Sequence, residues 1–378
     1  FWIGTILVRG PLMSYFGPKI FIDLKRLSNN YQLLVKEIKD LSIMATVKAN
    51  AYGHGAIEVS KTLEKEGVRY LAVFTIDEAI ELRKAGIKSD IFIYSKMDPK
   101  RIDEAQKNNL TLNVSSFEDL KTLDNFSGRI KGHLKFDTGM TRLGVPFDKA
   151  EEFLKKAKKI SSLEIEGLYS HFATADEGDL SYATNQLKKF NKVLDFANHL
   201  KIKAKFIHCS NSGAILNLPN SRFNMVRAGM LLYGAFPSDD VPQDLSIEPV
   251  MTFTAPVVEV RDVKKGTLIS YGGAYETKKD TKIAVIQAGF ADGVPRPWYI
   301  NGYVLFKNQK MKITGRICMD QLMIDIKDSN IAYGDEVLIF GSNDNGTIDI
   351  NEIAEKIDST SYVIVTSVGI RPKRIHKK

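Results

Sequence analysis

One stretch of the sequence decides the fold: Ile43-Met44-Ala45-Thr46-Val47-Lys48-Ala49-Asn50-Ala51-Tyr52-Gly53-His54-Gly55. Its first five residues are mostly apolar and predict a buried β-strand. The polar and glycine residues that follow predict a loop, and a helix is expected near residues 56–65. This order of strand, polar loop and helix recurs along the chain, so the fold depends on how often it recurs.

Eight strands are expected from residue 43 onward, and helices alternate with them. The strands are Ile43–Val47, Tyr70–Phe74, Ile91–Tyr94, Leu110–Val114, His133–Phe136, Glu164–Leu168, Lys205–Ile207 and Asn224–Val226. Such alternation favours a parallel sheet, and eight units in roughly two hundred residues predict a (β/α)8 TIM-type barrel. A doubly wound open sheet is the alternative, but its usual GxGxxG phosphate motif follows none of these strands. We place the barrel at residues 19–240 and expect a helix over 28–40, capped by Ser28, before strand 43–47.

The sequence changes character near residues 236–247, where Pro-Ser-Asp-Asp-Val-Pro-Gln-Asp predicts a linker. Beyond it we expect a mainly β C-terminal domain over residues 241–378, with one clear helix at 350–358. Its strands are expected at 251–260, 267–271, 282–287, 303–306, 310–314, 322–326 and 336–340. A first strand near residues 19–24 is expected to pack with this domain. Residues 1–18 are interpreted as an N-terminal extension of undetermined origin, either upstream sequence or the remnant of a longer protein.

Composition narrows the function classes. Of the 378 residues, 44% are hydrophobic and 26% are charged, and no apolar run is long enough to predict a membrane span. Two cysteines are too few for a disulfide framework, so we expect the protein to be located in the reducing cytoplasm. The net charge is +8, but lysines alternate with acidic residues along the expected helices, so we expect no nucleic-acid partner. The one dense basic run, residues 371–378, is interpreted as a solvated tail or a partner contact. Since no CxxC or HExxH spacing occurs, we expect no metal.

Polar and glycine residues follow several of the expected strands, where a barrel carries its active site. They occur at residues 48–55, 135–142, 169–171, 208–213 and 227–229. Lys48 alone is as readily a surface lysine as a functional one, but the glycines behind it permit close backbone approach to a ligand. Ser210-Asn211-Ser212-Gly213 opens a short helix and is compatible with both a phosphate site and an ordinary helix cap.

The stretch from Val47 to Gly55 resembles the pyridoxal-phosphate attachment motif of bacterial alanine racemases. Further motifs of that family follow in the same order: Asp137-Thr-Gly-Met-Thr-Arg142-Leu-Gly, His171-Phe-Ala-Thr-Ala-Asp176, Asn211-Ser212, Phe223-Asn-Met-Val-Arg227-Ala-Gly229, Ser270-Tyr271-Gly, Ala291-Asp292-Gly and Gly315-Arg-Ile-Cys-Met319-Asp320. The resemblance covers about residues 19–375 and both expected domains.

The resemblance implies an isomerase that interconverts L-alanine and D-alanine, using pyridoxal 5'-phosphate and two bases, and supplies D-alanine for peptidoglycan. Lys48 would form the Schiff base with the cofactor and act as the base on one face of Cα. Tyr271 would be the base on the other face and come from a second subunit, which implies a homodimer with a shared active site. A serine or broad-specificity racemase is the alternative, although Tyr362 favours alanine because it limits space. A carrier protein on a similar barrel would lack the second domain, and a decarboxylase would lack the two paired bases.

The resemblance also assigns the remaining site residues. The cofactor-binding positions are Lys48, Tyr52, His171, Ser212, Arg227, Gly229, Met230 and Tyr362. The substrate-binding positions are Arg142, Met319 and Asp320, and the supporting and entrance positions are Lys135, Asp176, Arg296 and Arg316. In the family Arg227 faces the pyridine nitrogen, to which an arginine cannot readily give a proton. Lys135 matches a lysine that is often carbamylated and orients Arg142.

Two positions depart from the family pattern. Phe290 stands where the family usually has a tyrosine, which removes a hydroxyl near the entrance. Arg371-Pro-Lys-Arg-Ile-His376 replaces the usual Arg-Val-Pro-Arg.

Overall fold

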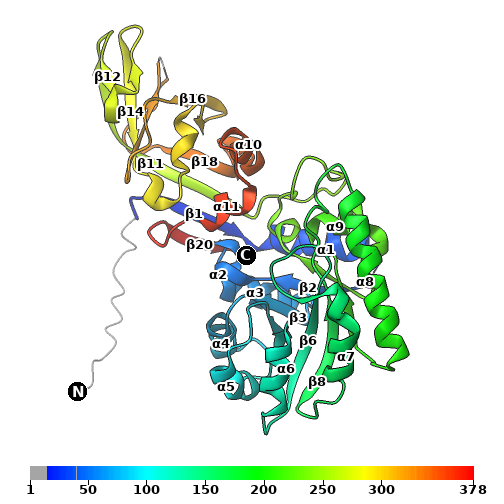
Figure 1. Cartoon of the computed structure of the whole chain (residues 1–378). Coiled ribbons are helices and arrows are strands. Elements are labelled where there is room, and N and C mark those ends of the chain that lie inside the picture. The colour runs from blue at the N-terminus through cyan, green and yellow to red at the C-terminus, as the bar shows by residue number, and fades with distance from the viewer. Residues whose placement is uncertain (1–14, 40, 328) are drawn as a thin grey trace, which may run out of the picture. The chain divides into compact units, whose positions relative to one another are not determined.

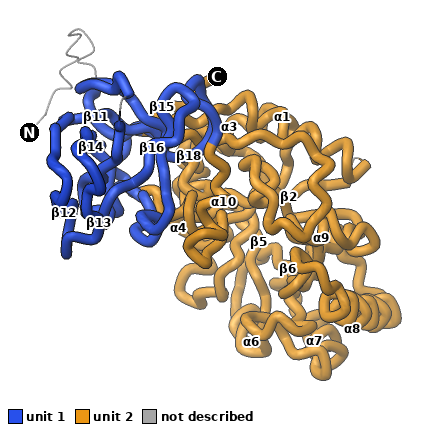
Figure 2. Tube along the Cα trace, turned by 90° about the horizontal axis from the view of Figure 1, so that it is seen from above, with its two compact units in different colours: residues 1–20, 253–347, 369–373 blue, residues 21–252, 348–368, 374–378 orange. Residues whose placement is uncertain are grey.

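The computed structural model describes residues 15–39, 41–327 and 329–378, so residues 1–14 of the expected extension lie outside the described part. The chain divides into two compact units (Figure 2). Unit 1 holds the described residues up to Ile20, together with 253–347 and 369–373. Unit 2 holds residues 21–252, 348–368 and 374–378. Both units are therefore discontinuous in sequence, whereas the sequence predicts one boundary between residues 240 and 241.

Unit 2 contains a closed barrel of eight parallel strands, which confirms the predicted fold and excludes the open sheet. The strands are β2 (Ser42–Thr46), β3 (Tyr70–Val73), β4 (Asp90–Ile93), β5 (Leu110–Val114), β6 (Ile130–Asp137), β8 (Leu163–Tyr169), β9 (Phe206–His208) and β10 (Met225–Ala228). Their order is β5-β4-β3-β2-β10-β9-β8-β6, and pairing of β5 with β6 closes the ring. Met44, Tyr70, Phe92, Tyr169 and Met225 fill part of the interior, so the barrel encloses a packed core.

Helices cover the outside of the barrel strands (Figure 1). They are α3 (Ala56–Lys65), α4 (Ile76–Lys84), α5 (Ile102–Lys107), α6 (Phe117–Asp124), α7 (Ala150–Ala157), α8 (Ser181–His199) and α9 (Ser212–Asn217). A capping box begins α4, because Thr75 accepts the Glu78 N–H and Glu78 accepts the Thr75 N–H. Ser28 as a helix cap is wrong: α1 spans Leu24–Glu37, and Asp23 caps it by accepting the Arg26 N–H at 3.0 Å.

A second large sheet, which lies mostly in unit 1, has nine strands in the order β19-β18-β15-β16-β17-β14-β11-β1-β20, and parts of β1, β11, β19 and β20 belong to unit 2. They are β1 (Lys19–Asp23), β11 (Met251–Val263), β14 (Thr281–Ile286), β15 (Tyr303–Phe306), β16 (Gln309–Ile313), β17 (Leu322–Asp325), β18 (Glu336–Asn343), β19 (Gly346–Ile348) and β20 (Lys373–Lys377). The first strand of the chain thus lies among the strands of the second half, as expected. A separate pair joins β12 (Leu268–Ile269) to β13 (Tyr275–Glu276). Tyr271 lies between these two strands, where it starts a short 3-10 turn rather than ending a strand.

Two helices lie in the C-terminal part of unit 2. α10 (Ile350–Lys356) matches the helix predicted at 350–358, whereas α11 (Ser361–Thr366) was not predicted. Its six residues include Val363 and Val365, which the pattern of apolar residues could not distinguish from a strand. Within the described ranges, every helix is too short or too polar to cross a membrane.

Candidate active site

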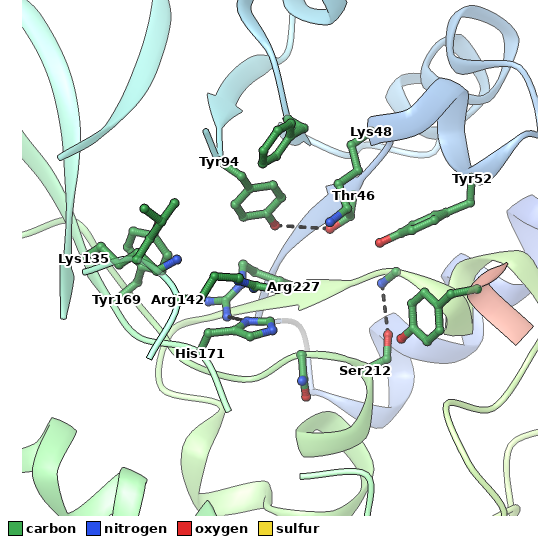
Figure 3. A pocket seen from close by; sticks show the side chains of 15 residues that line it. Thr46, Lys48, Tyr52, Tyr94, Lys135, Arg142, Tyr169, His171, Ser212 and Arg227 are labelled. Atoms are coloured by element: carbon green, nitrogen blue, oxygen red, sulfur yellow. Dashed lines mark hydrogen bonds between the residues drawn. The ribbon is translucent and has the colours of Figure 1, made fainter. Parts of the chain in front are cut away.

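A cavity of about 560 Å³ lies in unit 2, among side chains that follow the carboxyl ends of the barrel strands. Nine residues named from the sequence line it: Lys48, Tyr52, Lys135, Arg142, His171, Ser212, Arg227, Gly229 and Tyr362. Figure 3 shows most of these side chains converging on one space from several strands. The spacing of these residues along more than three hundred positions shows that the fold, not local sequence, brings them together.

Lys48 leaves the end of β2 and begins the short element α2 (Lys48–Tyr52), whose backbone is left-handed. The φ angles of Ala49, Asn50, Ala51 and Tyr52 are 51°, 53°, 53° and 50°. For residues with a Cβ this conformation costs roughly 1–2 kcal/mol each, so the turn as a whole is strained by several kcal/mol. The turn directs the side chains of both Lys48 and Tyr52 to the cavity.

Side chains and backbone groups hold this left-handed turn. Glu78 accepts the Ala49 N–H at 2.6 Å, and its other oxygen accepts the Phe74 N–H at 2.7 Å. His54 lies with Nδ1 2.9 Å from the carbonyl oxygens of both Ala51 and Tyr52. Since carbonyls only accept, this nitrogen carries the proton. Glu78, the glutamate of the α4 capping box, thus has a second role, which is to fix the backbone next to Lys48.

The glycines of the turn have a different purpose from the one we inferred. A Cβ on Gly53, which has a φ of 81°, would collide with the carbonyl oxygen of Val365 in α11. A Cβ on Gly55 would lie 2.6 Å from Nε2 of His376. The glycines therefore admit other parts of the chain behind the turn. Gly229 fits the original interpretation better, since a Cβ there would lie 3.2 Å from the Tyr52 hydroxyl at the cavity wall.

Two lysines in the cavity are easier to deprotonate than exposed lysines. Burial lowers the pKa of Lys48, and the positive charge of Arg142 lowers it further. Burial, Arg142 and Arg227 lower the pKa of Lys135 to about 7. Neutral amines near pH 7 can attack electrophiles or remove protons, which an ammonium ion cannot do.

Arg227 is buried and fixed at the end of β10 by four hydrogen bonds. One terminal nitrogen, Nη1, donates to His208 Nδ1 at 2.7 Å. The other, Nη2, donates to the carbonyl oxygens of Ser170 and Cys209 at 2.9 and 3.0 Å and to His171 Nδ1 at 3.0 Å. The guanidinium is therefore held as a rigid cationic wall of the cavity.

A chain of polar groups continues from Arg227 into the barrel core. Because the guanidinium only donates, His208 Nδ1 must accept and its proton lies on Nε2, 2.8 Å from His133 Nδ1. His133 then carries its proton on Nε2, which faces Glu166 Oε2 at 3.6 Å. Burial lowers the pKa of both histidines, so both rings are neutral. Two neutral rings thus connect a buried cation to a buried carboxylate.

Glu166 at the far end of this chain is ionised. Burial alone would raise its pKa, but hydrogen bonds with His133 and Tyr70 lower it to about 2. The Tyr70 hydroxyl donates to Glu166 at 2.7 Å, and Thr111 donates at 3.2 Å. None of these core residues was predicted from the sequence. Their signal is a polar or charged residue inside an otherwise apolar barrel strand, such as Glu166 in β8 and His133 in β6.

Hydroxyl groups gather at another part of the cavity. Ser212 begins α9, where Asn211 caps the helix, and its hydroxyl accepts the Gly229 N–H at 3.1 Å (Figure 3). The ring of Tyr52 packs edge-on against that of Tyr362, with centroids 5.8 Å apart. Burial raises the pKa of both tyrosines, so both hydroxyls keep their protons and can donate. Such a set of neutral donors next to a helix start suits a phosphate group.

Six further residues line the cavity and were not named as site residues: Thr46, Phe74, Tyr94, Leu143, Tyr169 and Asn211. The Thr46 and Tyr94 hydroxyls lie 3.2 Å apart, and Lys48 Nζ lies 5.7 Å from the centre of the Tyr94 ring. Thr46 is the last residue of β2, two residues before Lys48. Position at a strand end could have identified these residues, because Tyr94 directly follows β4.

Two of the named residues in unit 2 do not line the cavity. Met230 is fully buried in the 3-10 turn after Gly229. Asp176 is partly buried, and burial raises the pKa of its carboxyl group. A Cβ on Gly213 would lie 2.8 Å from the Asp176 side chain, so Asp176 lies behind the start of α9.

The remaining named residues, Tyr271, Arg296, Arg316, Met319 and Asp320, all belong to unit 1. Ser270 donates its hydroxyl to the Arg316 carbonyl at 2.6 Å, which joins the turn of Tyr271 to the segment that leads to Met319. The Tyr271 and Met319 side chains are 66% and 54% exposed. Unit 1 therefore presents them to the outside of its own fold.

Phe290 and Arg371, the first residue of the basic run, also have defined positions in unit 1. Phe290 is exposed, and the Arg296 guanidinium lies 6.0 Å from the centre of its ring. Arg371 donates to both carboxylate oxygens of Asp292 at 2.9 Å and to Asp320 at 2.7 Å. The interpretation of residues 371–378 as a solvated tail is thus wrong for Arg371, because a buried carboxylate binds it in a bidentate pair.

Comparison with known proteins identifies what this arrangement is similar to. Residues 22–237 match a family model described as alanine racemase, N-terminal domain, and residues 250–376 match alanine racemase, C-terminal domain. An alanine racemase from Halothermothrix orenii is 40% identical over 363 residues, which cover 94% of this chain and 96% of that protein. One from Methanococcus maripaludis is 40% identical over 367 residues, which cover 94% and 97%.

Solved structures agree with the sequence matches. Alanine racemase of Clostridium difficile 630 superposes with a TM-score of 0.90 at 35% identity and covers 97% of this chain and 96% of that chain. Alanine racemase of Bacillus anthracis with bound L-Ala-P superposes with a TM-score of 0.90 at 34% identity and covers 98% and 96%.

Proposed function

This chain belongs to the alanine racemase family and interconverts L-alanine and D-alanine as an isomerase, and we propose that Lys48 carries pyridoxal phosphate and serves as one of two bases. The observation that carries the proposal is that a lysine amine of lowered pKa shares one cavity with a rigid guanidinium and a cluster of neutral hydroxyls. The product D-alanine is expected to supply peptidoglycan.

The residues present fit the cofactor. The amine of Lys48 matches its aldehyde, the Arg227 guanidinium matches the pyridine nitrogen, and Tyr52, Ser212 and Tyr362 match the phosphate. Gly229 brings its backbone N–H to Ser212, where a side chain would meet the Tyr52 hydroxyl. When bound, pyridoxal phosphate withdraws electrons from Cα of the attached amino acid and so makes its proton removable.

Lys48 would remove or return the proton on one face of the substrate Cα. Its lowered pKa favours the neutral amine that this step needs. Racemisation also needs a proton donor on the opposite face, and we propose the Tyr271 hydroxyl of a second copy of the chain. Support comes from the exposed position of Tyr271 on unit 1 beside exposed Met319, a surface that suits an isologous dimer.

Arg227 would limit side reactions at the pyridine ring. As a donor that does not give up its proton, it can hydrogen-bond the ring nitrogen without protonating it. The four bonds that fix Arg227, and the histidine chain behind it, keep this geometry. A less strongly electron-withdrawing ring favours return of the proton to Cα over other outcomes.

Arg142 would bind the substrate carboxylate, and Lys135 would orient Arg142. With a pKa of about 7, the Lys135 amine is largely neutral at pH 8 and can attack carbon dioxide. The nitrogen–carbon bond that forms releases one proton to solvent and leaves a carbamate anion. Such an anion would offset the positive charges of Arg142 and Arg227.

Alanine, rather than serine, is the proposed substrate of this cavity. Phe74, Tyr94 and Tyr362 narrow the space next to Lys48 with aromatic rings. A larger side chain must displace one of them, which costs binding free energy. Activity on L-serine equal to that on L-alanine would contradict this assignment. A cytoplasmic location stays a prediction from the cysteine count.

Borohydride reduction tests the cofactor assignment. The purified protein, incubated with pyridoxal phosphate, should show an absorption band near the visible edge that reduction abolishes. Peptide mass spectrometry should then find the reduced cofactor on Lys48. Absence of the band, or a label elsewhere, would refute the assignment of Lys48.

Hydrogen exchange tests the two bases. Net rates cannot reveal which base serves which face, because enantiomers have equal free energy and kcat/KM must be the same in both directions. In deuterated water, Tyr271→Phe should retain exchange of the Cα hydrogen from one enantiomer and lose it from the other. Equal loss from both enantiomers would remove Tyr271 from this role.

A further inference from the structure

The last residues of the chain bind the turn that carries Lys48 and Tyr52. Arg374 Nε donates to the carbonyl oxygen of Gly53 at 2.8 Å. His376 Nε2 lies 2.9 Å from the carbonyl oxygen of His54, and since a carbonyl only accepts, this nitrogen donates. All of these residues belong to unit 2. Arg374 and His376, like Arg371, are therefore not part of a solvated tail.

These two bonds hold the exit of the left-handed turn. Gly53 and His54 directly follow the four residues with φ between 50° and 53°. A backbone in this conformation persists only where the surroundings hold it, and the entrance of the turn is already held by Glu78. Arg374 and His376 supply the corresponding contacts at the exit, and the bond from the guanidinium is charge-assisted.

The glycines of the motif make room for this contact. A Cβ on Gly55 would lie 2.6 Å from His376 Nε2 and 3.0 Å from its Cε1. The His376 imidazole is held in this place by its bond to the His54 carbonyl. The second glycine of Ala-Tyr-Gly-His-Gly thus serves the C-terminal histidine rather than a ligand.

Arg374 also binds the backbone after the helix that carries Tyr362, the second tyrosine of the hydroxyl cluster. Its Nη2 donates to the carbonyl oxygen of Val368 at 3.0 Å, just after the helix α11 that carries Tyr362. The same guanidinium thus bridges the turn that carries Tyr52 and the segment that carries Tyr362. The two rings meet edge-on with centroids 5.8 Å apart.

We infer that Arg374, with His376, positions the two tyrosine hydroxyls that receive the cofactor phosphate. Neither residue touches the cavity, so both act through the backbone of Gly53, His54 and Val368. The inference rests on the proposed function, since it takes the hydroxyl cluster to be the phosphate site. It makes the C-terminal segment part of cofactor binding, with an effect confined to the phosphate end.

Binding of two cofactor forms to the cofactor-free protein tests this inference. Pyridoxal phosphate and pyridoxal differ only in the phosphate, and both can react with Lys48. Arg374→Ala should weaken binding of pyridoxal phosphate by roughly ten- to a hundredfold, as expected for loss of hydrogen bonds from a charged group. Binding of pyridoxal should change less than about twofold, since the same phosphate-independent contacts remain. Arg374→Lys should restore part of the loss.

Control variants separate positioning from general damage. Lys377→Ala changes the charge of the same strand, and both cofactor forms should bind as they do to the unchanged chain. His376→Gln keeps a hydrogen-bond donor, so its affinity for pyridoxal phosphate should lie between those of Arg374→Ala and the unchanged chain. It also tests the inference if Arg374→Ala does not fold. Inorganic phosphate should compete with pyridoxal phosphate less well in Arg374→Ala and Arg374→Lys than in the unchanged chain.

Two different failures can be told apart. If the unchanged chain binds neither pyridoxal phosphate nor pyridoxal, the proposed function is refuted. If it binds both, but Arg374→Ala weakens both equally or neither, the inference about Arg374 is refuted and the proposed function stands.

Discussion

The titration of His54 gives a prediction with a magnitude. Its ring is buried and stacks 4.4 Å from that of Tyr233. Burial lowers its pKa from 6.5 to about 4, although the bonds from Nδ1 to the Tyr52 and Ala51 carbonyls oppose this shift. Among the described residues its Nε2 has no hydrogen-bond partner, so a second proton would have no acceptor. The folded chain therefore keeps His54 neutral far below the pH at which an exposed histidine takes up a proton.

The sign and the size follow from proton linkage. Between pH 6.5 and about pH 4 the unfolded chain holds a proton on this ring and the folded chain does not. The stability that His54 contributes is therefore complete above pH 6.5 and is lost as the pH falls toward 4. These two values give a loss of about 2 kcal/mol in the free energy of unfolding between pH 7 and pH 5.

Replacement by asparagine isolates this effect. In His54→Asn the amide can still donate to the turn carbonyls but does not titrate between pH 5 and pH 7. Urea unfolding, followed by circular dichroism at both pH values and one protein concentration, should show a pH-dependent loss about 2 kcal/mol smaller than in the unchanged chain. The other buried histidines contribute equally to both chains and cancel. His199→Asn, which makes the same replacement at an exposed histidine, is the matched control for the substitution itself. Equal pH dependence in His54→Asn and the unchanged chain would refute the reasoning.

Three further predictions concern two carboxylates outside the cavity and one lysine that lines it. Glu166→Gln removes the anion at the end of the histidine chain that leads to Arg227. It should lower kcat by roughly tenfold because Arg227 is held less firmly, while the cofactor band is retained. Loss of the band would contradict a role confined to Arg227. Glu78→Gln weakens the bond to the backbone next to Lys48 and should slow formation of the cofactor band by roughly tenfold in stopped-flow absorbance. An unchanged rate would exclude a role of Glu78 in positioning Lys48. Lys135, with its pKa of about 7, should give a carbamate signal by ¹³C NMR in labelled bicarbonate at pH 8 that fades below pH 6 and is absent in Lys135→Met.

The barrel could be predicted because its information is repeated. Each strand of three to eight residues is a weak signal alone, but eight in alternation with helices leave few topologies. The position of Lys48 followed from the same count, since parallel strands bring their carboxyl ends to one side. Nine of the named residues then line one cavity, although they come from distant parts of the chain.

The left-handed turn could not be predicted from its own residues. Asn50 is a residue type that tolerates positive φ, but Ala49 and Ala51 have no local preference that would outweigh the cost of a Cβ in that conformation. The turn exists because contacts from outside it, with Glu78, Arg374 and His376, offset that cost. From the sequence, the glycines were interpreted as allowing a ligand to approach the backbone. That interpretation missed the segments of the chain that pack behind them.

The charge pattern of the C-terminal run misled for a related reason. Six of the eight residues 371–378 are basic, and such a run is ordinarily solvated. A pattern of charge records what side chains carry but not which acceptors the fold places near them. Arg371 meets a carboxylate that is 1% exposed, and Arg374 meets two backbone carbonyls left by a turn and a helix end. Backbone acceptors leave no trace in the sequence, so a basic residue that binds them cannot be recognised by a matching acidic partner. A basic run at the end of a barrel enzyme is therefore better examined for unsatisfied turns and helix ends than for a complementary charge.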